Sequence, residues 1–185
     1  MTTQANINQP LQVLNWIAES ALEDAGVASQ LTPWLLEKGL LTSRVQQFCR
    51  RSFRLQVLNH NDPGSNWLRR FEDWAPCQGE QREIVMWCDD TPGLYAETVI
   101  PADTAEAQPW LRTLGTQPLG ERLQQMEGVS RSHLDFACIP VADNADIPGS
   151  WYNPGQHCLW ARRSHYNVQQ SKLWVIEVFL GAIDQ

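Results

Sequence analysis

Glu177 is the residue of this chain whose type and surroundings most suggest chemistry. It lies within Leu173–Leu180, where the other seven of eight residues are apolar, as in a strand buried on both faces. A buried carboxylate without a partner costs several kcal/mol, so such a residue is paired, kept neutral or used. It either pairs with Arg162 or Arg163, or lines a pocket whose apolar walls raise its pKa, so that it exchanges a proton or binds a ligand hydroxyl. Residue types alone leave both interpretations open.

Arg82 is the second candidate, because it too stands in an apolar row. In an extended strand it shares a face with Ile84, Met86 and Cys88. One interpretation is an arginine at a strand end that reaches solvent. The other is a planar guanidinium that binds a carboxylate through two parallel hydrogen bonds.

The third feature is the segment 117–123, in which Pro118 and Gly120 flank Leu119. Proline and glycine so placed predict a tight corner at the start of a helix. The backbone N–H groups of such a start favour anions. Ordinary helix initiation by proline explains the same pattern.

The composition excludes several other classes of function. A net charge of −7 argues against a nucleic-acid partner. The histidines and cysteines show no metal-ligand spacing, and the sequence has neither a glycine-rich phosphate loop nor a G-x-S-x-G elbow. No stretch approaches the roughly 18 apolar residues of a membrane span. We therefore expect no metal site and no membrane span.

The cysteines are odd in number and form no C-x-x-C pair, and the N-terminus resembles no secretory leader. These features predict reduced thiols in a cytoplasmic protein. The five are Cys49, Cys77, Cys88, Cys138 and Cys158.

The elements that must position these side chains follow from periodicity and turn residues. Helices lead and antiparallel strands follow, so the fold class is α+β in one domain. The predicted helices cover 10–25, 32–38, 43–48, 105–115 and 118–127. The predicted strands cover 53–59, 129–139, 157–168, 173–180 and a hairpin of 82–88 and 94–100 joined by a five-residue loop. Residues 67–80 are left unassigned, and 140–156 read as a long loop.

Several short motifs occur in one order along the chain: Arg-Glu-Ile at 82–84, Thr-Val-Ile-Pro at 98–101, Pro-Leu-Gly at 118–120, Leu-Trp-Ala-Arg-Arg-Ser at 159–164, and the glutamate strand. In this order and spacing the chain resembles chorismate lyase over roughly residues 31–181. We accordingly predict an N-terminal extension with a helix at 1–30 and a chorismate lyase-like domain at 31–185.

The resemblance implies a single antiparallel sheet flanked by helices, an enclosed ligand pocket, a monomer and no cofactor. It implies conversion of chorismate to 4-hydroxybenzoate and pyruvate, at the start of ubiquinone synthesis. Carried over to this sequence, Arg82 binds the ring carboxylate and Glu177 meets the ring hydroxyl. Leu119 and Leu41 supply backbone contacts.

Two departures from the family are visible. Ala96-Glu97 stands where the family often has Gly-Arg or Ala-Arg, and the 140–156 loop is enlarged. A rival function is a non-catalytic module that binds small aromatic acids, because effector domains of some transcription regulators resemble the same architecture. A catalytically inactive carrier of hydroxybenzoates is a further alternative.

Overall fold

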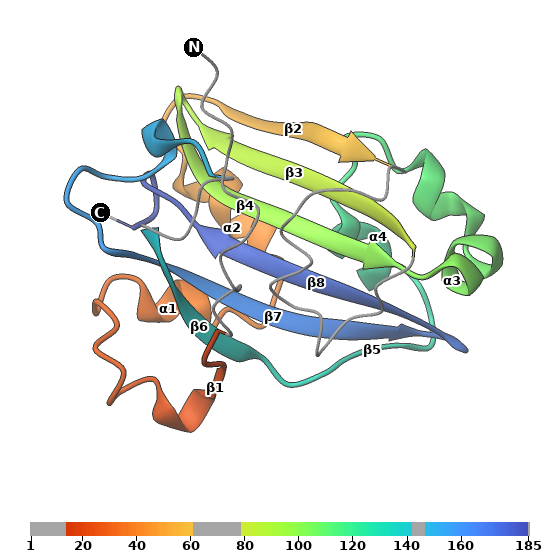
Figure 1. The fold of residues 1–185 in the computed structure, drawn as a ribbon. Helices are drawn as coiled ribbons and strands as arrows, with labels where there is room; N and C mark the ends of the chain where they lie inside the picture. Colours follow the sequence, from red (N-terminus) through yellow and green to blue (C-terminus); the bar gives the residue numbers. More distant parts are fainter. Residues whose placement is uncertain (1–13, 61–78, 142–146, 185) are drawn as a thin grey trace, which may run out of the picture.

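The structure, a computed structural model, describes residues 14–60, 79–141 and 147–184. Within them, eight strands form one antiparallel sheet in the order β1-β6-β7-β8-β4-β3-β2, with β5 also paired to β7 (Figure 1). The strands are β1 (Ile17–Ala18), β2 (Phe53–His60), β3 (Glu80–Cys88), β4 (Thr91–Ile100), β5 (Val129–Arg131), β6 (Asp135–Pro140), β7 (Cys158–Val168) and β8 (Ser171–Phe179).

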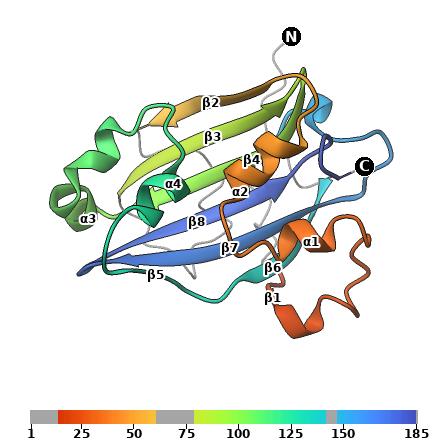
Figure 2. The same cartoon turned by 180° about the vertical axis from the view of Figure 1, so that it is seen from behind.

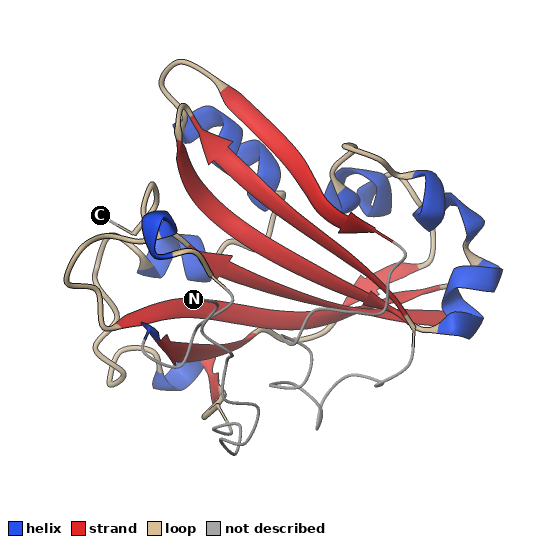
Figure 3. Cartoon of the chain, turned by 45° about the horizontal axis from the view of Figure 1, so that its top comes forward, coloured by secondary structure: helices blue, strands red, loops and turns tan. Residues whose placement is uncertain are grey.

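The helices α1, α2 and α4 lie over one face of this sheet, and α3 lies beyond its end (Figure 2). The helices are short (Figure 3), and among the described residues three 3₁₀ turns supplement them. The α-helices are α1 (Thr32–Leu35), α2 (Leu41–Phe48), α3 (Ala102–Ala107) and α4 (Leu119–Gln124), and the 3₁₀ turns are η1 (Glu19–Ala21), η3 (Pro109–Thr113) and η5 (Gly149–Trp151). The predicted α+β fold, an antiparallel sheet with flanking helices, is confirmed.

The strand register places the two candidate residues on the same face of the sheet. Arg82 pairs with Thr98, which pairs in turn with Val175, two residues before Glu177 on β8. Because side chains alternate along a strand, Arg82 and Glu177 both point toward the face that carries α1, α2 and α4. This face and the opposite one are both packed with apolar residues, so the sheet is buried on both sides.

The helix predicted over 10–25 is wrong for its described part, since residues 14–25 contain β1 and η1 instead. Ile17 pairs with Phe136 at the edge of the sheet, and this tertiary pairing overrides a weak helical pattern. The division at residue 30 stays a prediction.

The hairpin of β3 and β4 turns at two residues, Asp89 and Asp90, and not at the predicted five. Asp89 adopts a positive φ of 54°, which short hairpin turns require and aspartate tolerates. A register shift between Met86 and Trp87 then brings Pro92 into the strand. The predicted strand 129–139 is also divided, into β5 and β6.

The prediction of reduced thiols is wrong for four of the five cysteines. The structure has disulfides between Cys49 and Cys88 and between Cys138 and Cys158, with Cα separations of 4.9 and 5.6 Å. The first joins the end of α2 to the end of β3, and the second joins the neighbouring strands β6 and β7. Such pairs form across the fold, so their spacing in sequence does not reveal them. Cys77 lies outside the described residues.

No helix in the described ranges is long and apolar enough to cross a bilayer.

Candidate active site

A cavity of about 420 Å³ lies between the sheet and the helices that cover it. All four residues predicted for the site, Arg82, Glu177, Leu119 and Leu41, line this cavity. Leu119 begins α4 and Leu41 begins α2, so two helix starts contribute to its wall. Between the two charged residues the sheet presents mostly small or apolar side chains, which leave the space open; they are Ile84, Ala96, Thr98 and Val175.

Arg82 is only 2% exposed, so the interpretation that it reaches solvent is wrong. Its Nη2 donates to the carbonyl oxygens of Gly115 and Gln117, at 2.9 and 3.2 Å, in the corner that precedes α4. Its Nε is buried without a partner, and no described carboxylate forms a salt bridge with it. Burial lowers the pKa of Arg82 to about 10, so it stays charged at neutral pH. An uncompensated buried cation on a cavity wall is a binding site for an anion.

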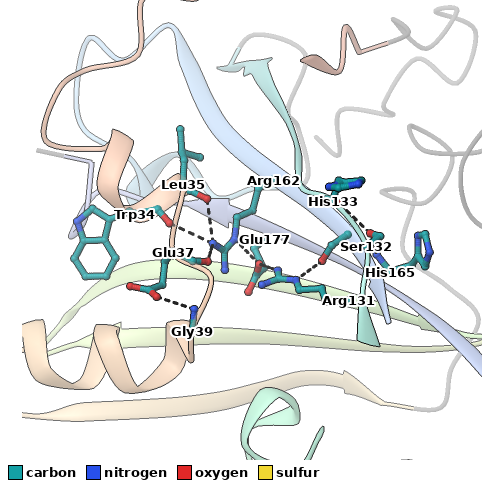
Figure 4. Close-up of polar contacts among 11 residues, drawn as sticks. Trp34, Leu35, Glu37, Gly39, Arg131, Ser132, His133, Arg162, His165 and Glu177 are labelled. Atoms are coloured by element: carbon teal, nitrogen blue, oxygen red, sulfur yellow. Dashed lines mark hydrogen bonds and ion pairs between the residues drawn. The ribbon is translucent and has the colours of Figure 1, made fainter. Parts of the chain in front are cut away.

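Glu177 binds two arginines through the same oxygen (Figure 4). Its Oε2 lies 2.6 Å from Nε of Arg162 and 3.2 Å from Nη2 of Arg131. Burial raises the pKa of Glu177, but the two guanidinium groups outweigh that effect and hold it below its usual value of 4.5. Of the two interpretations left open by the sequence, pairing with Arg162 is confirmed and a raised pKa is wrong, so Glu177 is ionised. Arg163 binds Asp135 instead, at 3.1 Å on the opposite face.

Arg162 connects this carboxylate to the segment that follows α1. It is wholly buried on β7, and its Nη1 donates to the carbonyl oxygens of Trp34, Leu35 and Glu37 at 3.3, 3.1 and 2.6 Å (Figure 4). α1 ends at Leu35 and not at the predicted Lys38, and the last carbonyl oxygens of a helix lack helical partners, so that of Leu35 can accept from Arg162. Arg162 thereby holds the chain where residues 38–42 begin to line the cavity.

Arg131 is a site residue that the sequence reasoning missed. Its Nε donates to Oγ of Ser164 at 2.8 Å, and its guanidinium lies 5.2 Å from the ring centre of Tyr166. A continuous strand over 129–139 would point Arg131 to the same side as Asp135, away from the cavity. Three residues separate β5 from β6, whereas two residues of β7 lie opposite them, so a bulge reverses the side on which Arg131 lies. The polar run Ser130–His133 between apolar stretches was the only signal of this break.

Tyr166 completes the polar wall of the cavity. Burial raises the pKa of its phenol above the usual 10.0, so the O–H group stays protonated and can donate a hydrogen bond. Among the residues that the structure describes, no three histidine, cysteine or acidic side chains are grouped so as to hold a metal ion. The described lining of the cavity offers fixed charges and hydrogen bonds, from Arg82, Arg131, Arg162, Tyr166 and Glu177.

Comparison with known proteins identifies the family of the chain. The sequence model of the family described as chorismate lyase matches residues 10–184. The chain belongs to the chorismate lyase family. Chorismate lyases are carbon–oxygen lyases, and this chain is accordingly an enzyme of that class.

Individual relatives match over most of their length. The chain is 30% identical to a probable chorismate pyruvate-lyase of Shewanella sp. (strain W3-18-1), covering 85% of this chain and 83% of that protein. It is 32% identical to a probable chorismate pyruvate-lyase of Ralstonia nicotianae, covering 81% and 80%. It is 25% identical to the chorismate pyruvate-lyase of Pectobacterium atrosepticum, covering 92% and 86%.

One departure from the chorismate lyase pattern is resolved by the register. Glu97, which stands where the family often has arginine, pairs with Glu83 and Ile176 on the face opposite the cavity. Ala96 is the residue of this pair that lines the cavity. The change at position 97 therefore does not alter the charge of the cavity wall.

Proposed function

We propose that this protein converts chorismate to 4-hydroxybenzoate and pyruvate without a cofactor. The observation that carries the proposal is that one cavity of about 420 Å³ holds both a buried arginine, which forms a salt bridge with no described carboxylate, and an ionised glutamate. Chorismate carries a ring carboxylate and a ring hydroxyl at opposite ends of its ring. Arg82 would bind the first and Glu177 the second.

The reaction needs little more than position and charge. The bond between the ring carbon and the ether oxygen breaks, and the enolpyruvyl group leaves. The ring carbon that bears the hydroxyl loses its proton, which ends in the methyl group of pyruvate, and the ring becomes aromatic. Much of the driving force thus lies in the substrate, and the protein contributes by holding one reactive conformer and neutralising its charge.

Each residue has a role in this scheme. Arg82 anchors the ring carboxylate through charge-assisted hydrogen bonds. Glu177, being ionised, accepts a hydrogen bond from the ring hydroxyl and stands beside the carbon that loses its proton, as a base does. The backbone at Leu119 and Leu41 completes the contacts to the ring substituents. We further propose that the enzyme is monomeric, acts in the cytoplasm and supplies ubiquinone synthesis.

The test is to incubate the purified protein with chorismate and to identify the products. We expect pyruvate, measured with lactate dehydrogenase, in equal amount to 4-hydroxybenzoate, measured by chromatography against 3-hydroxybenzoate. Arg82→Met should abolish both products, whereas Arg163→Met, on the opposite face, should retain them. Tight binding of 4-hydroxybenzoate with no turnover of chorismate would favour the non-catalytic binding module instead.

A further inference from the structure

The cavity carries more positive charge than one carboxylate of a ligand would neutralise. Its described charged lining consists of Lys38, three arginines and Glu177. Nζ of Lys38 lies 3.5 Å from Oε2 of Glu19, and the Lys38 side chain is 73% exposed, so solvent screens its charge. The three arginines against one glutamate leave a net charge of +2 inside a protein whose total is −7. Such a cavity matches a dianion.

The second charge is available at Arg131 and not at Arg162. Arg162 has 1% of its side chain exposed, its Nε and Nη1 are bound to Glu177 and to three carbonyl oxygens, and its Nη2 is buried with no described partner. Arg131 keeps 17% of its side chain exposed, its bond to Glu177 is the longer one, and no described hydrogen bond engages its Nη1. Glu177 can neutralise only one of the two guanidinium groups, and Arg162 holds it more closely.

The strand register gives the separation between the parts of the sheet that hold the two available cations. Ser164, which binds Nε of Arg131, lies in the same row across the sheet as Arg82, with Thr98 and Val175 between them. Three strand spacings separate their backbones, or about 14 Å. The strands that hold Arg82 and the Ser164 contact of Arg131 are therefore at opposite sides of a cavity that both guanidinium groups line, and a ligand that spans it can meet both.

We infer that Arg131 binds a second carboxylate of the ligand, at the end of the cavity opposite Arg82. The inference rests on the proposed function, in which that group is the carboxylate of the enolpyruvyl side chain. The hydrogen bond that Nε of Arg131 donates to Ser164 orients the guanidinium, and the ring centre of Tyr166 lies 5.2 Å from it. Arg131 is then a determinant of specificity for dicarboxylates over monocarboxylates.

A matched pair of stable ligands tests the inference without turnover. 3-(1-Carboxyvinyloxy)benzoate has both carboxylates, and 3-isopropenyloxybenzoate has a methyl group in place of the second. Binding of each is measured by titration calorimetry with the wild-type protein and with Arg131→Met, Arg131→Lys, Arg82→Met and Arg163→Met. We expect the wild-type protein to prefer the dicarboxylate by about tenfold or more, since a charge-assisted hydrogen bond is worth roughly 1.5–3 kcal/mol.

Arg131→Met should reduce that preference to about twofold or less, with the affinity for the monocarboxylate changed by less than about threefold. Arg131→Lys should retain part of the preference, Arg163→Met all of it, and Arg82→Met should weaken both ligands. Equal weakening of both ligands by Arg131→Met, or no preference in the wild-type protein, would overturn the inference. Turnover of chorismate is measured separately: a preference without turnover removes the lyase proposal and leaves the role of Arg131 intact.

Discussion

Oε2 of Glu177 lies 2.6 Å from Nε of Arg162, and Nη1 of that guanidinium donates to carbonyl oxygens at the end of α1 and just beyond it. One buried arginine therefore ties the carboxylate of the cavity to the segment that covers it. Breaking such a pair by removing one partner leaves a buried charge uncompensated. Substitutions at this pair should accordingly affect stability as well as activity.

Replacing Glu177 separates these two effects. Glu177→Gln keeps the volume and an oxygen that accepts from Arg162 but removes the negative charge, so turnover of chorismate should fall by about 100-fold or more while part of the stability is retained. Glu177→Ala should lower the free energy of unfolding further, by about 3 kcal/mol relative to the wild-type protein, because Arg162 loses its hydrogen-bond acceptor as well as its counter-charge. Steady-state kinetics and urea unfolding measure the two quantities. Near-normal turnover of Glu177→Gln would contradict the role of the carboxylate.

The stability that Glu177 provides should depend on pH. Its pKa in the folded protein lies below the usual 4.5, so its contribution is complete above that value and is lost as the pH falls through the folded-state pKa. The difference in free energy of unfolding between the wild-type protein and Glu177→Gln should therefore shrink as the pH is lowered below about 4.5. Urea unfolding of both proteins, at intervals of about one pH unit between pH 3 and pH 7, measures this difference. A difference that grows on acidification would mean that Glu177 is neutral when folded.

Arg82 should matter for the ligand far more than for the fold. Its desolvation opposes folding, and its two carbonyl hydrogen bonds offset that cost, so Arg82→Met should change the free energy of unfolding by no more than about 1 kcal/mol. In the wild-type protein, 4-hydroxybenzoate at 100 times its Kd should add about 2.7 kcal/mol. Thermal denaturation with and without the ligand should show that this increment disappears in Arg82→Met. If 4-hydroxybenzoate still stabilised Arg82→Met to the same extent, Arg82 would not be the residue that binds its carboxylate.

Arg162→Lys should loosen the segment after α1. A lysine ammonium cannot hold Glu177 and three carbonyl oxygens in the geometry of the planar guanidinium. Amide hydrogen exchange over residues 36–42 should therefore become faster, and the free energy of unfolding should fall by about 2 kcal/mol. Arg163→Lys, one residue further along β7 and on the opposite face, is the control and should leave exchange in 36–42 unchanged.

The two disulfides can be counted directly. Of five cysteines, four are bonded, so thiol titration of the unreduced, denatured protein should find one thiol per chain, and the reduced protein five. Reduction should lower the free energy of unfolding by roughly 3 kcal/mol for each bond, because each closes a loop of 20 or 39 residues in the unfolded chain. Urea unfolding with and without a reductant measures this change. Five thiols before reduction would show that the disulfides do not form and that the prediction of reduced cysteines holds.

The amino-acid sequence alone determined the sheet and the two ends of the candidate site. Alternation along 82–88 and the apolar run around Glu177 depend on a period of two residues, which local chemistry enforces. Those patterns placed Arg82 and Glu177 in apolar rows of two strands, and the motif order indicated the family. The start of α4 at Leu119 followed from Pro118 in the same local way.

Only the tertiary structure decided the charge state of Glu177 and the place of Arg131. Apolar neighbours in sequence suggest a raised pKa, whereas the pKa is lowered by arginines that are 15 and 46 residues away along the chain. A single extra residue between β5 and β6 decides whether Arg131 lines the cavity, and Arg162, distant along the chain, binds a carbonyl oxygen at the end of α1. Each of these outcomes is set by contacts between distant segments, which periodicity along one segment does not encode.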